Sequence, residues 1–302
     1  MANNSDQLMS KSIVIANSPG KGKGIFAVQN ITKGECLIRE KPIMGGSGQD
    51  GQLLAKLTAQ LHALPTQQQR GLLELHWPLR PQYPLRSRFY ANAFDVTNKS
   101  DTVSEGGICL NAARFNHACI PTAYWVWNCH IERLTLHAIT DIPKGGEIFV
   151  SHAPFDSPPE ERIDTLNNIY GFTCSCFERE VRRLEADRLH TRMEELGFKE
   201  GRRDKDKART MATPGSDEDP LPTILKLIEV CKNAGFPTLA LATLHGQASS
   251  CYFWRGDSGR ERECKAKQRE VATWCIGKEA SERIIKDVEQ LVTLLVEIPN
   301  VN

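Results

Sequence analysis

Residues 114–122 read RFNHACIPT, which places an asparagine, a histidine and a cysteine almost side by side among apolar residues. Amide, imidazole and thiol groups bind ligands and metals, but buried polar side chains also satisfy nearby backbone groups. Two interpretations of Asn116 and His117 are therefore open: part of a binding site, or locally satisfied core residues. The segments on either side of this stretch distinguish the two.

Short β-strands are predicted on both sides of the quoted stretch. Residues 12–18 and 36–44 are rich in isoleucine and bounded by glycine, proline and asparagine, as strands are. Between them lies SPGKGKGIFAV, with glycines at 20, 22 and 24. The aromatic and β-branched segments 123–129, 133–139 and 142–150 continue the strand pattern.

Helical spacing replaces the strand pattern in two further places. Leucines recur along one stripe from Leu53 onward, Pro65 ends that helix, and Thr66 with Gln69 predicts a capping box for the next one. A second helix is predicted over residues 158–170, with Gly171 suited to a left-handed stop.

The composition limits the class of protein and its compartment. The chain has 302 residues, 40% of them hydrophobic and 25% charged, with a formal net charge of +1. These values are typical of a globular protein and predict no general attraction to nucleic acid or membrane. The start of the sequence resembles no secretory signal, so the ten cysteines are expected to be reduced thiols or metal ligands in the cytoplasm or nucleus.

Four motifs, taken in order, carry a resemblance to a known family: GKGKGIFA, NHACIP, AITDIPKGGEIFVSH and YGFTCSC. Together they resemble the SET-domain family of protein lysine methyltransferases. The similarity is closest to the fungal and SET-and-MYND-like branch, although no zinc-binding MYND module follows Pro42.

The resemblance implies an α+β fold in two parts. Residues 12–176 are expected to form short sheets with a knot-like crossing and a helical insert at about 50–106. Residues 177–302 are expected to form an all-helical, tetratricopeptide-like region, although no clean period of about 34 residues is visible. The charged stretch at about 199–220 predicts a mobile linker.

The resemblance also implies that S-adenosylmethionine (SAM) is the cofactor and indicates which residues bind it. Glycine permits close approach by the backbone, so the turn at 20–24 is expected to meet the methionine end of SAM; an ordinary hairpin turn is the alternative. Asn116 and His117 would bind the cofactor at the crossing. The full expected set is Lys21, Gly22, Lys23, Gly24, Asn92 near the ribose, Asn116, His117, and Phe172 against the adenine.

Three cysteines correspond to ligands of a zinc site in the family: Cys119, Cys174 and Cys176. A closed structural zinc site needs four ligands, and the family's fourth position is Arg179 here. Either Cys251 or Cys264 in the tail supplies the fourth ligand, or the three remain thiols without a metal.

The chain departs from the family at the end of GGEIFVSH, where His152 replaces a tyrosine that closes the transfer channel. Methyl transfer is an in-line attack by a neutral amine, and the reference pKa of lysine is about 10.4, so the site must desolvate and orient that amine. An imidazole can serve as a base, which makes His152 the candidate catalytic residue. Further changes at Ala118, Thr122 and Gly146 favour a site with relaxed demands.

Three functions are therefore compared. The first is SAM-dependent methylation of an exposed lysine on a histone or another protein. The second is a catalytically degenerate SET-like protein that binds or regulates, and the third is a SET scaffold acting in small-molecule metabolism. A zinc hydrolase would need a ligand set such as HExxH, which this sequence lacks.

Overall fold

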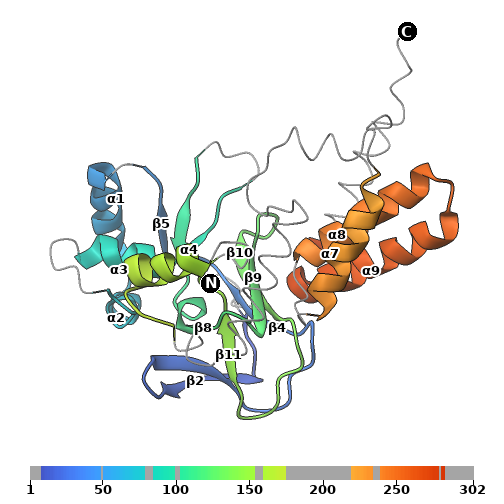
Figure 1. Ribbon diagram of the computed structural model, residues 1–302. Coiled ribbons are helices and arrows are strands. Elements are labelled where there is room, and N and C mark those ends of the chain that lie inside the picture. The colour runs from blue at the N-terminus through green and yellow to red at the C-terminus, as the bar shows by residue number, and fades with distance from the viewer. Residues whose placement is uncertain are drawn as a thin grey trace, which may run out of the picture. The chain divides into compact units, whose positions relative to one another are not determined.

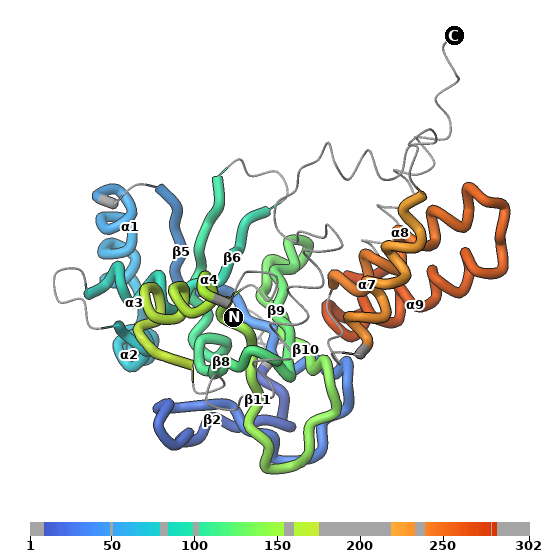
Figure 2. Tube along the Cα trace, in the orientation of Figure 1, coloured from blue at the N-terminus to red at the C-terminus, as the bar shows by residue number. Residues whose placement is uncertain are grey.

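The computed structural model describes residues 8–48, 50–78, 84–98, 103–153, 159–174, 219–233, 239–278 and 280–282. The chain divides into two compact units, residues 1–191 and 192–302. Blue to yellow in Figures 1 and 2 follows the described part of the first unit, and orange to red follows the second. The two units are described separately below.

The first unit is built from three small sheets rather than one large one. Their strand orders are β1-β4-β10-β9, β2-β3-β11-β8 and β5-β7-β6. The strands are β1 (Leu8–Met9), β2 (Ile13–Ser18), β3 (Gly22–Ala27), β4 (Cys36–Glu40), β5 (Met44–Gly46), β6 (Ala93–Asp95), β7 (Gly106–Ile108), β8 (Asn116–His117), β9 (Ala123–Asn128), β10 (Arg133–Ala138) and β11 (Glu147–Val150). Each predicted strand segment contains one of these strands.

The first two sheets share one hydrophobic core. Ile38 of β4 lies opposite Leu136 of β10, and both are fully buried. Ile25 of β3 and Ile148 of β11 pair across the second sheet and are equally buried. Burying such side chains stabilises the fold by about 1.5–3 kcal/mol each, so the sheet faces that carry them are held together firmly.

The quoted stretch contains β8, an edge strand of the second sheet, and its pairing with β11 is called the crossing below. Strand β8 runs parallel to β11, with Asn116 opposite Phe149 and His117 opposite Val150. Parallel pairing of short strands requires the chain to return from a distance, and here it joins residues about thirty positions apart. The crossing therefore places Asn116 and His117 beside the segment that ends in His152.

Three helices follow β5 and pack as a second core beside the third sheet (Figure 1). They are α1 (Asp50–Ala63), α2 (Thr66–Leu73) and α3 (Pro84–Asn92). Leu53 and Leu57 are buried, as the leucine stripe predicts, whereas Leu54 of the same stripe is exposed. The insert expected at about 50–106 thus contains these three helices, followed by β6.

The predicted capping box at Thr66 is wrong. Thr66 is already helical, Pro65 occupies the N-cap position, and no side chain caps the helix. Gln69 instead donates its Nε2–H to the Leu64 carbonyl, 2.8 Å away. The fixed φ of proline orients the helix start, which leaves the threonine hydroxyl outside the capping position.

The first unit ends its described part with a helix that changes type. Helix α4 (Pro159–Thr165) continues directly into a π-helix, η3 (Leu166–Tyr170). Gly171 follows with φ 72°, the left-handed stop that was predicted. Residues 170–174 then pass along the cavity described in the next section.

The second unit is helical in its described part, with α7 (Leu221–Asn233), α8 (Leu239–Trp254) and α9 (Ser258–Ile276). Helix α8 packs against both α7 and α9. This confirms the helical C-terminal region, while its tetratricopeptide-like pairing stays a prediction. Of the linker expected at about 199–220, residues 199–218 lie outside the described residues.

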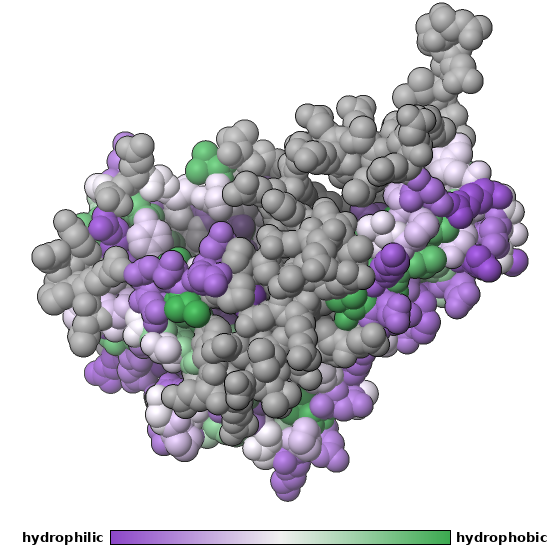
Figure 3. Space-filling model, viewed as in Figure 1, coloured by the Kyte–Doolittle hydropathy of each residue, from purple (hydrophilic) through white to green (hydrophobic). Residues whose placement is uncertain are grey.

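Among the helices described, none is long and apolar enough to span a bilayer. On the face shown in Figure 3, hydrophobic residues form small separate groups among hydrophilic ones.

The buried His245 in α8 should make the second unit less stable as the pH falls. It is 5% exposed, and neither ring nitrogen has a hydrogen-bond partner among the described residues. Burial, and then the charges of Lys232 and Lys267, lower the pKa of His245 to about 4. The unfolded chain therefore takes up a proton below pH about 6.5 that the folded chain does not, so the free energy of unfolding falls as pH drops from about 6.5 to about 4.

Thermal denaturation of the full chain between pH 7.5 and 4.5 measures this slope. His245→Leu should flatten it, whereas His62→Gln, which changes an exposed histidine of α1, should leave it unchanged. Equal slopes in the wild type and His245→Leu would contradict the assignment.

Candidate active site

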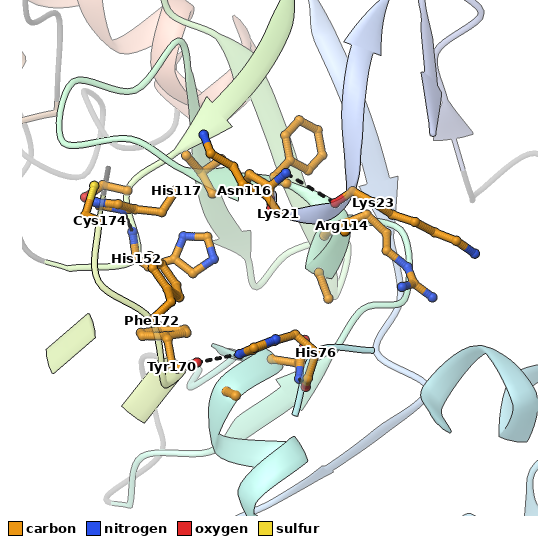
Figure 4. A pocket seen from close by; sticks show the side chains of 18 of the residues that line it. Lys21, Lys23, His76, Arg114, Asn116, His117, His152, Tyr170, Phe172 and Cys174 are labelled. Carbon is orange, nitrogen blue, oxygen red and sulfur yellow. Dashed lines mark hydrogen bonds between the residues drawn. The ribbon is translucent and has the colours of Figure 1, made fainter. Parts of the chain in front are cut away.

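A cavity of about 690 Å³ lies in the first unit, within the usual range of about 300–1,000 Å³ for ligand pockets. Its walls come from several separate parts of the chain. They are the β2–β3 turn, the loop after α2, the end of α3 with β6, residues 112–117, Trp125, residues 150–152 and residues 170–174. Figure 4 shows His152, Tyr170 and Phe172 on one side and Lys21, Lys23, Asn116 and Arg114 on the other.

The glycine turn is tied to the crossing through Asn116. Asn116 donates from Nδ2 to the Lys23 carbonyl at 3.2 Å and to Glu147 Oε1 at 2.7 Å. Ser18 Oγ donates to the other Glu147 oxygen at 3.1 Å. A Cβ on Gly24 would lie 2.5 Å from Glu147 Oε1 and 2.9 Å from Asn116 Nδ2, so only glycine leaves room for this arrangement.

Basic side chains surround the turn. Lys21 Nζ lies 4.7 Å from the centre of the Phe149 ring, and Lys23 Nζ forms a 3.0 Å ion pair with Glu74. The bond from Lys23 holds the pKa of the exposed Glu74 carboxyl below its ordinary value. Arg114 approaches the same carboxylate at 3.6 Å. This wall therefore presents two lysines and an arginine with one carboxylate among them, a surface suited to an anionic group.

His117 has a fixed tautomer in this arrangement. Its Nδ1 accepts the backbone N–H of His152 at 3.0 Å, so the neutral ring carries its proton on Nε2. That Nε2 lies 3.5 Å from Cys119 Sγ, which in turn lies 3.9 Å from Cys174 Sγ. His117 thus connects the backbone at His152 to a pair of buried thiols.

The described residues of this cluster provide fewer ligand atoms than a closed zinc site needs. His117, Cys119 and Cys174 each offer a donor atom within 4.8 Å of the others. Because Nε2 of His117 carries the proton, the described part of the cluster supplies two thiol sulfurs. The third predicted ligand, Cys176, and Arg179 lie outside the described residues. Cys251 and Cys264 belong to the other unit, which is not placed relative to this one.

His152 lies at the centre of an aromatic cluster. Its ring packs edge-on against Tyr170, with centroids 4.8 Å apart, and against Phe172 at 6.3 Å. Its Nδ1 is buried and has no hydrogen-bond partner among the described residues. Burial, followed by repulsion from His117, lowers the pKa of His152 to about 3, so the imidazole is neutral at physiological pH.

Asn92 and Phe172 occupy the predicted walls, but Asn92 uses its donors elsewhere. Its Nδ2 donates to the carbonyls of His76 and Arg88, each at 2.7 Å. Only its oxygen remains for a ligand. The centres of the Phe172 and His117 rings are 6.1 Å apart, and Phe172 lines the cavity beside Thr173. All the sequence-predicted cofactor residues except Gly24 line this one cavity, and Gly24 lies directly behind Asn116.

Among the cavity residues that sequence reasoning missed are Tyr170 and His76. Burial raises the pKa of Tyr170 to about 12, so its phenol stays protonated and can donate a hydrogen bond. Its position directly before the helix-stop Gly171 was a usable signal. His76 directly precedes the proline-rich residues 77–86, and nothing in the sequence marked it.

The comparison with protein families agrees with this geometry. Residues 22–153 match the family model described as SET domain, a range that includes the glycine turn, the crossing and His152. Residues 22–153 are a SET domain. The predicted resemblance is thereby confirmed, as is the α+β fold of short sheets followed by a helical region.

Several relatives of this SET domain protein bear names of lysine methyltransferases. Histone-lysine N-methyltransferase set5 of Schizosaccharomyces pombe is 27% identical over 173 residues, which are 55% of this chain and 51% of set5. N-lysine methyltransferase SMYD2 of Gallus gallus is 27% identical over 101 residues, 33% of this chain and 23% of its own. Human histone-lysine N-methyltransferase SMYD3 is 29% identical over 114 residues, which are 37% of this chain and 26% of SMYD3. The match to this chain thus covers about half of the length of set5 and about a quarter of the length of each of the other two relatives.

Proposed function

We propose that the SET domain transfers a methyl group from SAM to the ε-amine of a lysine exposed on a protein. The substrate would be a histone or another protein of the cytoplasm or nucleus. The observation that carries this proposal is the single cavity, which joins the glycine turn and Asn116 to His152 and Tyr170. The relatives' names, histone-lysine and N-lysine methyltransferase, support the same reaction.

The cavity residues fit SAM in their chemistry. The basic wall of Lys21 and Lys23 suits the carboxylate of the methionine end, and the oxygen of Asn116 is left to accept a hydrogen bond. Phe172 offers an apolar ring for the adenine. When bound, SAM supplies an electrophilic methyl on a positively charged sulfur.

In this proposal His152 and Tyr170 orient the lysine amine. With a pKa of about 3, His152 is too weak a base to take a proton from an ammonium group of pKa about 10.4. The ammonium must therefore lose its proton to solvent before transfer, which a neighbouring positive charge favours. The imidazole and the phenol of Tyr170 then hold the neutral amine while its lone pair bonds to the methyl carbon and the carbon–sulfur bond breaks.

A zinc ion on Cys119, Cys174 and Cys176 would be structural in this scheme. It would tie the crossing to residues 174–176 and so hold Phe172 at the cavity. A closed site needs four ligands, and the described residues supply two thiols. Zinc analysis of untagged protein, expressed as moles per chain, tests this part of the proposal separately.

A second candidate is a SET-like protein that binds SAM without transferring its methyl. The replacement of tyrosine by His152 favours it, because an imidazole places its donor and acceptor at different points from a phenol. His152→Tyr distinguishes the two functions. Gain of transfer in that variant, with none in the wild type, would select the binding protein.

The proposed transfer predicts a specific effect of removing the imidazole nitrogens. His152→Phe should lower kcat by about 100-fold, the usual scale for one orienting hydrogen bond, while the Kd for SAM stays within about threefold. Calorimetry with SAM and tritiated-methyl transfer to histones and lysate proteins measure the two quantities. His62→Gln serves as the control. No heat of SAM binding to the wild type would remove the proposed function.

A further inference from the structure

The loop between α2 and α3 is held in place by two side chains of α3. Arg88 donates to the carbonyls of Leu73 at 3.2 Å and Leu75 at 3.5 Å. Asn92 donates to the carbonyl of His76 at 2.7 Å. Arg88 and Asn92 are both buried, and these partly buried bonds hold the backbone carbonyls of Leu73, Leu75 and His76.

This loop contacts the chain at two points, at the last residue of η3 and at the glycine after it. His76 Nε2 lies 2.5 Å from the Tyr170 carbonyl oxygen (Figure 4). A carbonyl only accepts, so His76 donates from Nε2. Next to it, a Cβ on Gly171 would lie 2.7 Å from Pro78 Cβ, so the two backbones are packed directly against each other.

These two contacts determine where the aromatic rings of the segment lie. Tyr170 carries the ring that covers His152 at 4.8 Å, and Phe172 lies on the far side of Gly171 at 6.3 Å from the same imidazole. Gly171, at φ 72°, is a point at which the backbone turns sharply. Among the described residues the Tyr170 side chain makes no hydrogen bond of its own, so the place of its ring follows from the place of its backbone.

We propose that His76 is a positioning residue of the active site. Its Nε2–H holds the Tyr170 carbonyl, which keeps residues 170–172 against the loop and the Tyr170 ring over His152. The helical insert thereby becomes part of the site, through a histidine that touches neither the glycine turn nor the crossing. Only the effect on methyl transfer rests on the proposed function; the positioning itself does not.

The burial of His152 provides a readout that needs no substrate. The groups that face its ring are Tyr170, His117 and His76. In the wild type the ring should stay neutral between pH 7.5 and 5. If the Tyr170 ring moves away, water reaches the imidazole of His152. Its pKa should then rise toward the ordinary value of about 6.5, which lies between pH 5 and 7.5.

The test compares His76→Gln with His76→Leu in the full chain labelled with ¹⁵N-histidine. Both changes replace the imidazole by an uncharged side chain, but only glutamine keeps an Nε2–H donor at similar reach. The signals of His152 are assigned by their loss in His152→Phe. We expect no titration of His152 between pH 7.5 and 5 in the wild type and His76→Gln, and a titration in His76→Leu.

Two results would overturn the proposal: a His152 that stays neutral in His76→Leu, or one that titrates equally in both variants. His76→Asn, whose shorter amide does not reach the carbonyl, replaces the leucine variant if that protein misfolds. In transfer assays, His76→Leu should lower kcat about tenfold with rescue by glutamine. If the wild type binds no SAM, the proposed function fails while the titration still decides the positioning.

Discussion

Replacing Gly24 by alanine should weaken SAM binding by at least about 100-fold, a loss of about 2.7 kcal/mol. The added methyl would lie 2.5 Å from Glu147 Oε1 and 2.9 Å from Asn116 Nδ2, closer than real Cβ atoms approach such groups. Asn116 must then give up its bonds to Glu147 and to the Lys23 carbonyl, which hold it beside the turn. Calorimetry with SAM measures the loss.

Gly51→Ala is the matched control for this change. Gly51 lies in α1, and a Cβ there meets nothing within 4 Å. The control should bind SAM like the wild type and gain up to about 1 kcal/mol of stability, because alanine is the better helix former. SAM affinity of Gly24→Ala within about threefold of the control would show that the Asn116–Glu147 bond does not shape the cofactor site.

Glu40→Ala should destabilise the first unit by about 3 kcal/mol or more. Glu40 is 1% exposed, and its carboxylate accepts the backbone N–H groups of Asn111 and Ala112 at 3.0–3.1 Å. These are the first N–H groups of the short 3₁₀-helix η2 (Ala112–Arg114), which leads into Asn116. Alanine would leave them buried without an acceptor.

Denaturant unfolding of the full chain measures this change. Glu105→Ala is the control, since that half-exposed carboxylate pairs, among the described residues, with the exposed Lys56; it should cost less than about 1 kcal/mol. Glu40→Gln should fall between the two, because its amide keeps one acceptor oxygen. Equal midpoints for Glu40→Ala and Glu105→Ala would contradict the anchoring role.

The sequence supported the strands well because aromatic and β-branched composition is a local property. β9 and β10 fall within the predicted segments, and β10 is buried on both faces, at Leu134 and Leu136 as well as at Thr135 and His137. The parallel pairing of Asn116 with Phe149 is not local, so no periodicity could reveal it. It followed only from the resemblance to the SET family.

The site was predictable where a motif marks it and not where packing alone creates it. Glycine spacing and the Asn-His pair identified one wall of the cavity. His76 became a neighbour of Tyr170 only because Arg88 and Asn92 hold a loop whose prolines hid any pattern. The capping box at Thr66 failed for a related reason, since the preceding proline already set the helix start.

The π-helix before Gly171 makes the direction of the Tyr170 side chain depend on the number of residues in that helix. A π turn is what an α-helix contains when one residue is added within a turn. Each residue of an ordinary helix advances the side-chain direction by about 100°. A chain one residue shorter between Thr165 and Gly171 would close into regular helix and turn the Tyr170 ring away from His152. The register between this phenol and the imidazole is thus set by one residue of chain length.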